Sequence, residues 1–419
     1  LLIFLIVNEL GWFSQKYYVS VGMFFLIWSG YYFLLPYYLF LQGRTDLDFY
    51  WLLVLIVVVI FLFFTFIGAR YTKKSREFKQ VNSFFYFKEV HLSKLYVVSI
   101  FFLFLHIFEI VYNYGTISLF EALSQRLINR GNTEWGGISM YIAYFKSAFY
   151  GFFESFLIVY LLKINKKLLA FIIVLLLVYF YLFSGSKYAL MWLFFFVAAS
   201  NLVGSKIFFR KFYLYILLFL SILLVPFINL LRDQTEISFG VISRFFDVLV
   251  QRSDLLPSMF FLVKEMHSEG AGYSYGETII SILFRFIPRE FFPDRLGSSD
   301  VEMTKLLYGD VSWTLNMGGI GEFYYNFGVV GVLVIGFITG FLLKKFHIYL
   351  VQSVKNNNYL FTSVLLSSPI WSTPWGIGFN NLFTESFIFW LIATFLIVII
   401  FRLKVKVRVC AIKSNNLHE

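Results

Sequence analysis

The chain alternates between long apolar stretches and short polar connections over its whole length. A helix needs about 20 predominantly apolar residues to cross the hydrocarbon core of a bilayer. Lipid offers no partner to exposed backbone groups, so helices are the expected spanning elements. The pattern predicts an all-α polytopic membrane protein with about 10–11 transmembrane helices. The predicted spans are 20–41, 50–69, 95–112, 138–162, 168–183, 188–203, 211–231, 318–343, 359–371 and 381–401, with a fragment at 1–10.

Polar intervals divide the chain into three parts: transmembrane helices at 1–231 with a loop at 113–137, a large loop at 232–317, and helices with a basic tail at 318–419. Loops longer than about 12–15 residues are usually functional or disordered. The large loop carries helix signals. Ser299 and Glu302 form a capping box that opens a short helix, and Gly309 closes it. Amphipathic pieces lie on either side of Pro257. We expect short amphipathic helices on or in the membrane surface.

The distribution of charge predicts on which side of the membrane each connection lies. Only 14% of residues are charged and 59% are hydrophobic. The basic residues gather in alternate connections, at 70–94, 163–167, 206–211, 344–355 and 402–413. Basic connections stay in the cytoplasm, so we predict a cytoplasmic C-terminus and an outer, periplasmic position for 113–137 and 232–317. The formal net charge of +11 then reflects topology, and no nucleic-acid partner is predicted.

The two ends of the given sequence carry few signals about fold or function. The single cysteine, Cys410, lies in the basic tail and excludes a disulfide framework. The sequence opens inside an apolar run without Met, and we expect a trimmed chain whose first span has lost its start.

The segment RFIPREFFPDR gathers charge in an outer loop that is otherwise not basic. Arg285, Arg289 and Arg295 carry planar guanidinium groups that match phosphate bidentately. Two prolines stiffen the segment. The alternative is internal pairing with Glu290 and Asp294, and we expect one of the three arginines to be used in that way.

Other basic residues are expected at the same membrane depth. Arg232 ends a span, and Lys187 occupies a tight turn; snorkelling to the interface is the alternative for both. Arg126 and Arg130 share one face of a short helix in the first loop, opened by a capping box at 118–121. They could bracket an anion or touch lipid headgroups. Together these groups predict an anionic ligand presented from the lipid, and a lipid pyrophosphate fits.

No zinc motif, P-loop, dinucleotide fingerprint or serine elbow occurs in the sequence. A sugar on a lipid pyrophosphate is already activated, so transfer requires no metal or cofactor, only a group that deprotonates an acceptor hydroxyl. The candidates for that base are Glu322, His267, Asp294 and Glu277. Glu322 stands in a glycine-rich helix start, and a first-turn carboxylate is its alternative role. Three further ionisable residues, His106, Glu109 and Glu385, lie near outer helix ends.

Four features resemble the Wzy-type polymerases of O-antigen and capsule repeat units: the many-span layout with one late outer loop, FSGSKYALMW, IPREFFPDR and GGIGEFYYNFGVVGVLVIGFITG. Lys187 stands where that family usually has Arg. The resemblance implies a polymerase of the bacterial inner membrane. It would transfer a growing glycan from undecaprenyl pyrophosphate to the non-reducing end of a new lipid-linked unit. The seven basic residues named above would hold the pyrophosphates, and Glu322 or His267 would be the base. Partners could include a chain-length co-polymerase and a flippase.

Three other functions stay open. An O-antigen ligase shares the donor chemistry, and a transferase using lipid monophosphate sugars would use Asp46 and Asp48. A lipid-linked oligosaccharide flippase would need charges along a path through the membrane. Lys146 and Glu154 are the chief mid-span charges.

Overall fold

The fold is described from a computed structural model. It describes residues 2–9, 49–74, 84–87, 92–118, 121–122, 138–183, 192, 196, 199, 255–268, 270, 272–284, 299–309, 318–355, 359–368, 387–400 and 405–408. Its helices are α1 (Leu2–Glu9), α4 (Phe49–Lys74), α5 (Leu92–Tyr114), α7 (Ile138–Lys163), α8 (Lys167–Phe183), α12 (Leu255–Ser268), α13 (Glu277–Phe284), α14 (Ser299–Tyr308), α15 (Gly318–Lys355), α16 (Tyr359–Leu366) and α18 (Phe387–Ile400). Two short strands, β1 (Phe84–Phe87) and β2 (Val405–Arg408), pair antiparallel. The described part is thus helical apart from this ribbon, which the all-α prediction missed.

Four of the described helices are long and apolar enough to cross a membrane: Phe49–Tyr71, Lys94–Tyr114, Phe145–Lys163 and Gly318–Ser353. They match the spans predicted at 50–69, 95–112, 138–162 and 318–343, and α8 and α18 are shorter apolar helices. The protein is therefore a helical membrane protein. The spans predicted at 20–41 and 211–231, and most of 188–203, lie outside the described residues.

α15 continues past the predicted end at residue 343, through two lysines, to Lys355. The extension remains helical because it keeps an inward face, with Phe346 and Leu350 buried. In contrast, α16 ends at Leu366, short of the predicted 371. Eight residues of helix rise only about 12 Å, so α16 does not cross a bilayer.

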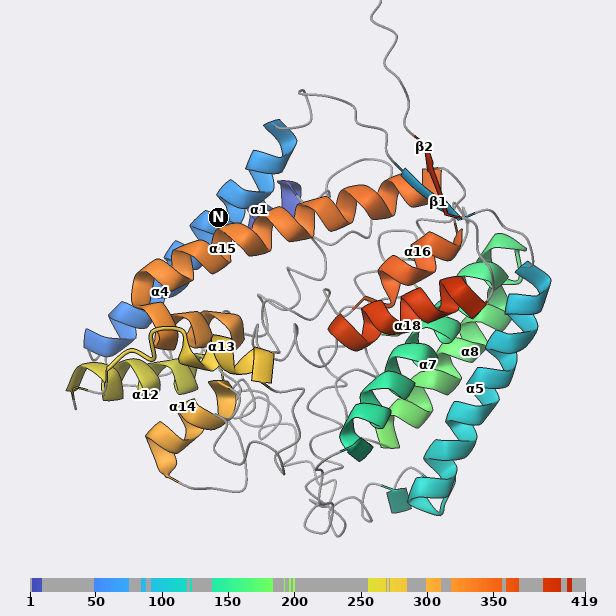
Figure 1. The fold of residues 1–419 in the computed structure, drawn as a ribbon, viewed down its shortest axis with the longest axis horizontal. Helices are drawn as coiled ribbons and strands as arrows, with labels where there is room; N and C mark the ends of the chain where they lie inside the picture. The colour runs from blue at the N-terminus through green and yellow to red at the C-terminus, as the bar shows by residue number, and fades with distance from the viewer. Residues whose placement is uncertain are drawn as a thin grey trace, which may run out of the picture.

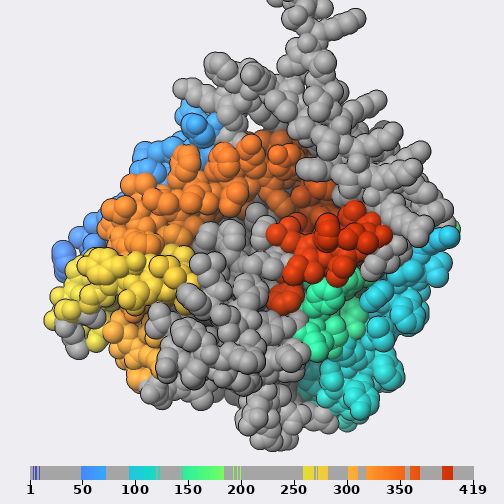
Figure 2. Space-filling model, in the orientation of Figure 1, coloured from blue at the N-terminus to red at the C-terminus, as the bar shows by residue number. Residues whose placement is uncertain are grey.

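The helices form two groups (Figure 1). One contains α1, α4 and α15 with α12, α13 and α14, and the other contains α5, α7, α8, α16 and α18. The largest buried cluster takes side chains from both groups, including Phe61, Leu157, Val174 and Ile335, so they share one core. In the space-filling view α15 runs across the molecule above α12 and α13 (Figure 2).

α4 and α15 pack in parallel at backbone contact. A Cβ added to Gly336 would approach the carbonyl oxygen of Phe61 to 2.8 Å, and one added to Gly68 would lie 2.1 Å from that of Phe337. Small residues permit this distance, as at other helix pairs in membranes. Parallel packing agrees with the charge pattern, which starts both spans on one side.

The ribbon defines one end of the molecule. At that end α7 finishes and α16 begins, and the Lys163 ammonium lies 4.4 Å from the centroid of the Tyr359 ring. We call this the ribbon end. The opposite end, where α4, α7 and α15 begin and α5 and α8 finish, is the loop end (Figure 1). Pairing of β1 with β2 places 84–87 and 405–408 on the same side of the membrane, as the charge pattern predicts.

One face of α5 turns outward. Val97, Phe101, Phe104 and Phe108 recur every three or four residues and are each more than 60% exposed. A stripe of large apolar side chains on the outside of a spanning helix is the surface expected against lipid.

Candidate functional site

The predicted pyrophosphate clamp lies outside the described residues. This applies to every basic residue assigned to it, namely Arg126, Arg130, Lys187, Arg232, Arg285, Arg289 and Arg295, and also to Asp294. The clamp therefore stays a prediction. The structure does describe Glu322, His267 and the helices of the large loop.

The large loop contributes three helices that pack at the loop end. α14 begins at Ser299 and ends at Tyr308, as predicted, and Gly309 closes it with φ 71°. α12 is continuous from Leu255 and includes Pro257 in its first turn. It packs on α4 through a stacked pair, Trp51 and Phe260, with ring centroids 4.7 Å apart. The helix preceding Pro257 in the sequence pattern falls outside the described residues.

A kink in α15 receives the turn before α13. Gly328 has φ 60° and ψ −147°, which breaks the helix. The Tyr325 carbonyl, just before the kink, accepts a hydrogen bond of 3.0 Å from the Ser274 backbone N–H. A Cβ on Gly328 would also lie 3.2 Å from the Tyr273 ring. Glycine is required here both for the positive φ and for the contact.

Asn326 ties α15 to α13. Its Oδ1 accepts from the Gly276 N–H at 3.1 Å and from the Thr278 hydroxyl at 3.0 Å. Its Nδ2 donates to the Thr278 hydroxyl at 2.7 Å and to the Glu322 carbonyl at 2.8 Å. All of these groups are buried. Within the aromatic-Asn-Phe-Gly sequence, the asparagine thus holds a loop helix against a spanning helix.

The described base candidates differ in access. Glu322 is completely buried near the start of α15. His267 is exposed at the end of α12, where its Nδ1 donates to the Val263 carbonyl at 2.9 Å. Its ring stacks on Tyr324, with centroids 6.4 Å apart. Glu277 begins α13. These residues occupy one corner of the loop end, and the described contacts do not join them into a common cluster.

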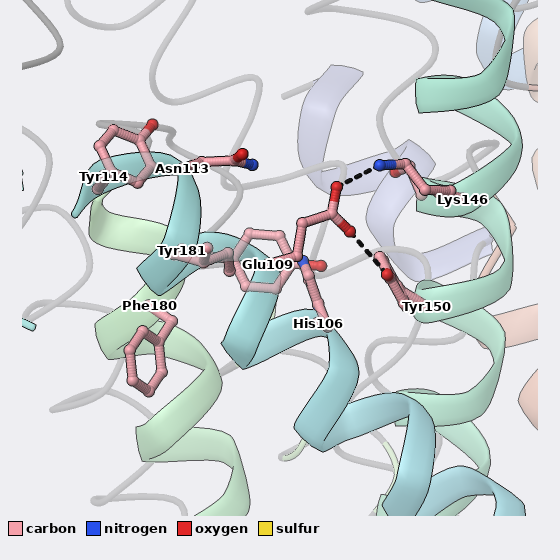
Figure 3. Close-up of a pocket in the computed structure, with 10 residues that line it drawn as sticks. His106, Glu109, Asn113, Tyr114, Lys146, Tyr150, Phe180 and Tyr181 are labelled. Carbon is pink, nitrogen blue, oxygen red and sulfur yellow. Dashed lines mark hydrogen bonds and ion pairs between the residues drawn. The ribbon is translucent and has the colours of Figure 1, made fainter. Parts of the chain in front are cut away.

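The described residues form a polar cavity elsewhere, among α5, α7 and α8 (Figure 3). Its volume is about 260 Å³, and it is lined by His106, Glu109, Ile110, Asn113, Tyr114, Lys146, Ser147, Tyr150, Phe180 and Tyr181. The cavity lies toward the loop end because it includes the last turns of α5 and α8 and the first half of α7. Ionisable residues inside spanning helices are costly, and they usually mark a functional site.

One ion pair lies in the wall of the cavity and joins α5 to α7. The Lys146 ammonium on α7 bonds the Glu109 carboxylate on α5, and the Tyr150 hydroxyl donates to the same carboxylate at 2.7 Å (Figure 3). The side chains of Lys146 and Glu109 are 43% and 28% exposed, so both reach the open part of the cavity. An anionic or hydroxyl-bearing ligand would meet a cation and a carboxylate side by side.

A second pair lies deeper. Nδ1 of His106 is 2.5 Å from a carboxylate oxygen of Glu154, whose side chain is completely buried. The Tyr181 hydroxyl donates to the other oxygen of Glu154 at 3.3 Å. The His106 ring stacks on Tyr150 at 4.2 Å between centroids and meets Tyr181 edge-on at 5.3 Å. The imidazole is thereby fixed on three sides.

From the sequence, His106 and Glu109 were expected near an outer helix end and Lys146 and Glu154 in mid-span, but not as one cluster. A signal existed. Lys146, Tyr150 and Glu154 are spaced four apart and share one face of α7, and His106 and Glu109, three apart, share a face of α5. Which helix faces which could not be read from spacing.

The segment that follows α5 agrees with its prediction in part. The Ser118 carbonyl accepts the Ala122 N–H at 3.0 Å, which starts the expected turn. The Glu121 carboxylate, however, bonds the hydroxyl of Thr116, and that hydroxyl accepts from the Ser118 N–H at 3.0 Å. The Thr116 hydroxyl therefore links the Ser118 backbone N–H to the Glu121 carboxylate.

The fold and the cavity define a helical membrane protein with an ionisable site between spanning helices. Comparison of the chain with protein-family models, with curated proteins and with solved structures finds no match. Within the described residues, no three His, Cys, Asp or Glu side chains gather as a metal-ligand set.

Proposed function

We propose that the protein is a glycosyltransferase that joins lipid-linked glycan units at the outer face of a bacterial inner membrane. In this scheme it is a repeat-unit polymerase: the growing glycan leaves undecaprenyl pyrophosphate and is transferred to the non-reducing end of a new unit. The observation that carries the proposal is the cavity among α5, α7 and α8. It presents a carboxylate-bound histidine and an ammonium group at the end of the bundle where the large-loop helices pack.

These groups suit the chemistry. Glycosyl transfer from a pyrophosphate needs a proton acceptor for the incoming hydroxyl and cations for the leaving group. The cavity supplies an imidazole, and the loop arginines, foremost Arg289 and Arg295, would supply most of the positive charge. Tyr114, Phe180 and Tyr181 give it aromatic walls that suit a sugar ring. The volume of about 260 Å³ accommodates one sugar rather than a chain.

The test is extension by purified protein in lipid nanodiscs. A lipid-pyrophosphate-linked repeat unit is added without metal, and products are separated by size. We expect a ladder of lengthening glycans. Arg289→Ala and Arg295→Ala should each abolish the ladder while membrane insertion stays normal. A protein that makes no product from this substrate is not a polymerase. If the ladder forms and both variants keep it, the pyrophosphate clamp is wrong.

The substrates used distinguish a polymerase from the two other transferase functions. A ligase would transfer the same donor glycan to a finished lipid core and leave the repeat unit unextended. A transferase that uses lipid monophosphate sugars would extend only with that donor, and it would lose activity on Asp46→Asn or Asp48→Asn.

Translocation of a lipid-linked oligosaccharide is a second candidate, and one observation favours it. Two ionisable pairs, Lys146 with Glu109 and His106 with Glu154, lie inside spanning helices, as in proton-coupled carriers. Proteoliposomes holding a fluorescent lipid-linked oligosaccharide would test it. Flipping exposes the fluorophore to a membrane-impermeant quencher, so protein-dependent loss of the protected fraction supports a flippase and its absence argues against one.

A further inference from the structure

The contacts of His106 orient its ring as a general base. A carboxylate can only accept hydrogen bonds, so the 2.5 Å contact with Glu154 places the imidazole proton on Nδ1. The lone pair of the neutral ring then lies on Nε2. His106 lines the cavity whereas Glu154 lies behind it, with its side chain completely buried. The ring is held by stacking on Tyr150 and by edge contact with Tyr181.

We propose that His106 is the group that takes the proton from the acceptor hydroxyl, and that Glu154 positions it. This inference rests on the proposed function. As the sugar hydroxyl oxygen bonds to the anomeric carbon, its proton passes to Nε2 of His106. The bond from that carbon to the pyrophosphate oxygen breaks, and the lipid pyrophosphate leaves with the electron pair. The buried Glu154 carboxylate stabilises the imidazolium that forms, just as a third group orients the base in other nucleophile–base pairs.

The other described candidates are less suited to this role. Glu322 is completely buried, whereas a base must come within about 2.6–3.2 Å of the hydroxyl it deprotonates. His267 is accessible, but the partner of its Nδ1 is the neutral carbonyl of Val263 and not a carboxylate. His106 combines access to a cavity with a buried carboxylate partner.

The Lys146–Glu109 pair completes the arrangement. Glu109 lies one helical turn from His106 on α5, and its carboxylate is oriented by Lys146 and Tyr150. A carboxylate beside the base can accept a hydrogen bond from a neighbouring sugar hydroxyl and so align the reacting one. The substrate class assigned to this cavity is therefore a neutral sugar ring presenting two adjacent hydroxyl groups, and the anionic leaving group lies outside it.

The experiment measures extension of a lipid-pyrophosphate-linked repeat unit by four proteins: the unaltered chain, His106→Gln, Glu154→Gln and the control Tyr112→Phe. Tyr112 lies on α5 and is 76% exposed on its outer face. Loss of a general base lowers rates about 10²–10⁴-fold, and we expect a decrease in that range for His106→Gln. Glu154→Gln should lower kcat with little change in KM and alter the pH profile. Tyr112→Phe should match the unaltered chain.

Rescue by added imidazole distinguishes a folding defect from the loss of the base. His106→Gly removes the ring from a slot bounded by Tyr150 and Tyr181, and added imidazole should restore extension to this variant but not to Glu154→Gln. Restored activity supports the assignment. Failure of imidazole to rescue a variant that elutes and melts like the unaltered protein overturns it.

The remaining outcomes are distinct. If the unaltered chain extends the unit and His106→Gln does so within twofold, His106 is not the base although the proposed function stands. If His267→Gln abolishes extension while His106→Gln does not, the base lies at α12. If the unaltered chain extends nothing, the proposed function fails and this role fails with it.

Discussion

Gly340 of α15 lies so close to Thr65 of α4 that a Cβ added to the glycine would stand 1.9 Å from the Thr65 carbonyl oxygen and 2.9 Å from the Ala69 backbone nitrogen. Both obstructing atoms belong to the backbone, so no rotamer change relieves the overlap. The Thr65 hydroxyl is itself turned away, donating to the Phe61 carbonyl at 2.8 Å. This contact sets the separation of the two helices on which the large loop rests.

Replacement of Gly340 by Ala should therefore force α4 and α15 apart. Overpacking a tight interface costs about 1–3 kcal/mol or more, and we expect a lower apparent Tm of the purified protein in detergent. Gly151→Ala on α7 is the matched control because a Cβ there meets nothing within 4 Å. It should leave Tm unchanged or raise it slightly. Equal effects of the two substitutions would show that the close approach is wrong.

Asn326→Ala should release α13 from α15. The substitution leaves the buried Gly276 N–H without its Asn326 acceptor, and an unsatisfied buried group costs about 1–3 kcal/mol. Hydrogen exchange followed by mass spectrometry should show faster exchange across 272–284 and little change in α5 and α7. Ser268→Ala, which removes an exposed hydroxyl bonded to the Lys264 carbonyl, is the control. Unchanged exchange at 272–284 would mean that Asn326 does not hold the loop.

Among the described residues, the sequence predicted four spanning helices correctly and their contacts poorly, for a physical reason. A span is specified by local hydropathy, so 50–69 and 138–162 correspond closely to α4 and α7. A contact depends on which faces meet. The GxxxG pair Gly336 and Gly340 was readable as a possible helix interface, but nothing local identifies Gly68 as its counterpart. Such pairings are set by tertiary packing.

The candidate site shows the same division. Glu109 and Lys146 belong to different spans, and their pairing follows from how α5 and α7 face each other. The ribbon was missed because each strand has only four residues and its partner lies near the other end of the chain. By contrast, the short helix α14 was placed correctly, because a cap and a terminal glycine mark it locally.

The ion pair in the cavity should behave as a coupled unit. Lys146→Met leaves a carboxylate in a partly desolvated site, and Glu109→Gln leaves an ammonium there. Each should destabilise the protein more than the double substitution does. Residues in direct contact show coupling energies of about 0.5–3 kcal/mol, and we expect a value in that range from the four apparent Tm measurements converted to free energies. Additive effects would show that the pair contributes no interaction.

The ribbon predicts a specific cross-link. Tyr86 and Lys406 are direct partners in the register. With Cys410 replaced by Ser, cysteines at 86 and 406 should form a disulfide under mild oxidation, since opposed residues have Cβ atoms about 4.5–5.5 Å apart. Cysteines at 84 and 405 are the control: they are three positions out of register, about 10 Å apart along the strand. Cross-linking of both pairs at equal rates would contradict the register.

Sidedness can be read with the chain's own cysteine. Cys410 is the single cysteine and follows β2, so a charge-set topology places it in the cytoplasm. A membrane-impermeant maleimide should label it only after the inner membrane is made permeable. Tyr275, 77% exposed in the turn before α13, is the opposite reporter. Tyr275→Cys in a Cys410→Ser background should react in spheroplasts whose inner membrane is intact, because the charge pattern predicts that the large loop faces outward. Labelling of Cys410 from outside, or protection of position 275, would show that the orientation is the reverse of the predicted one. The α5–α7–α8 cavity would then open toward the cytoplasm, where a glycan already carried across the membrane could not reach it.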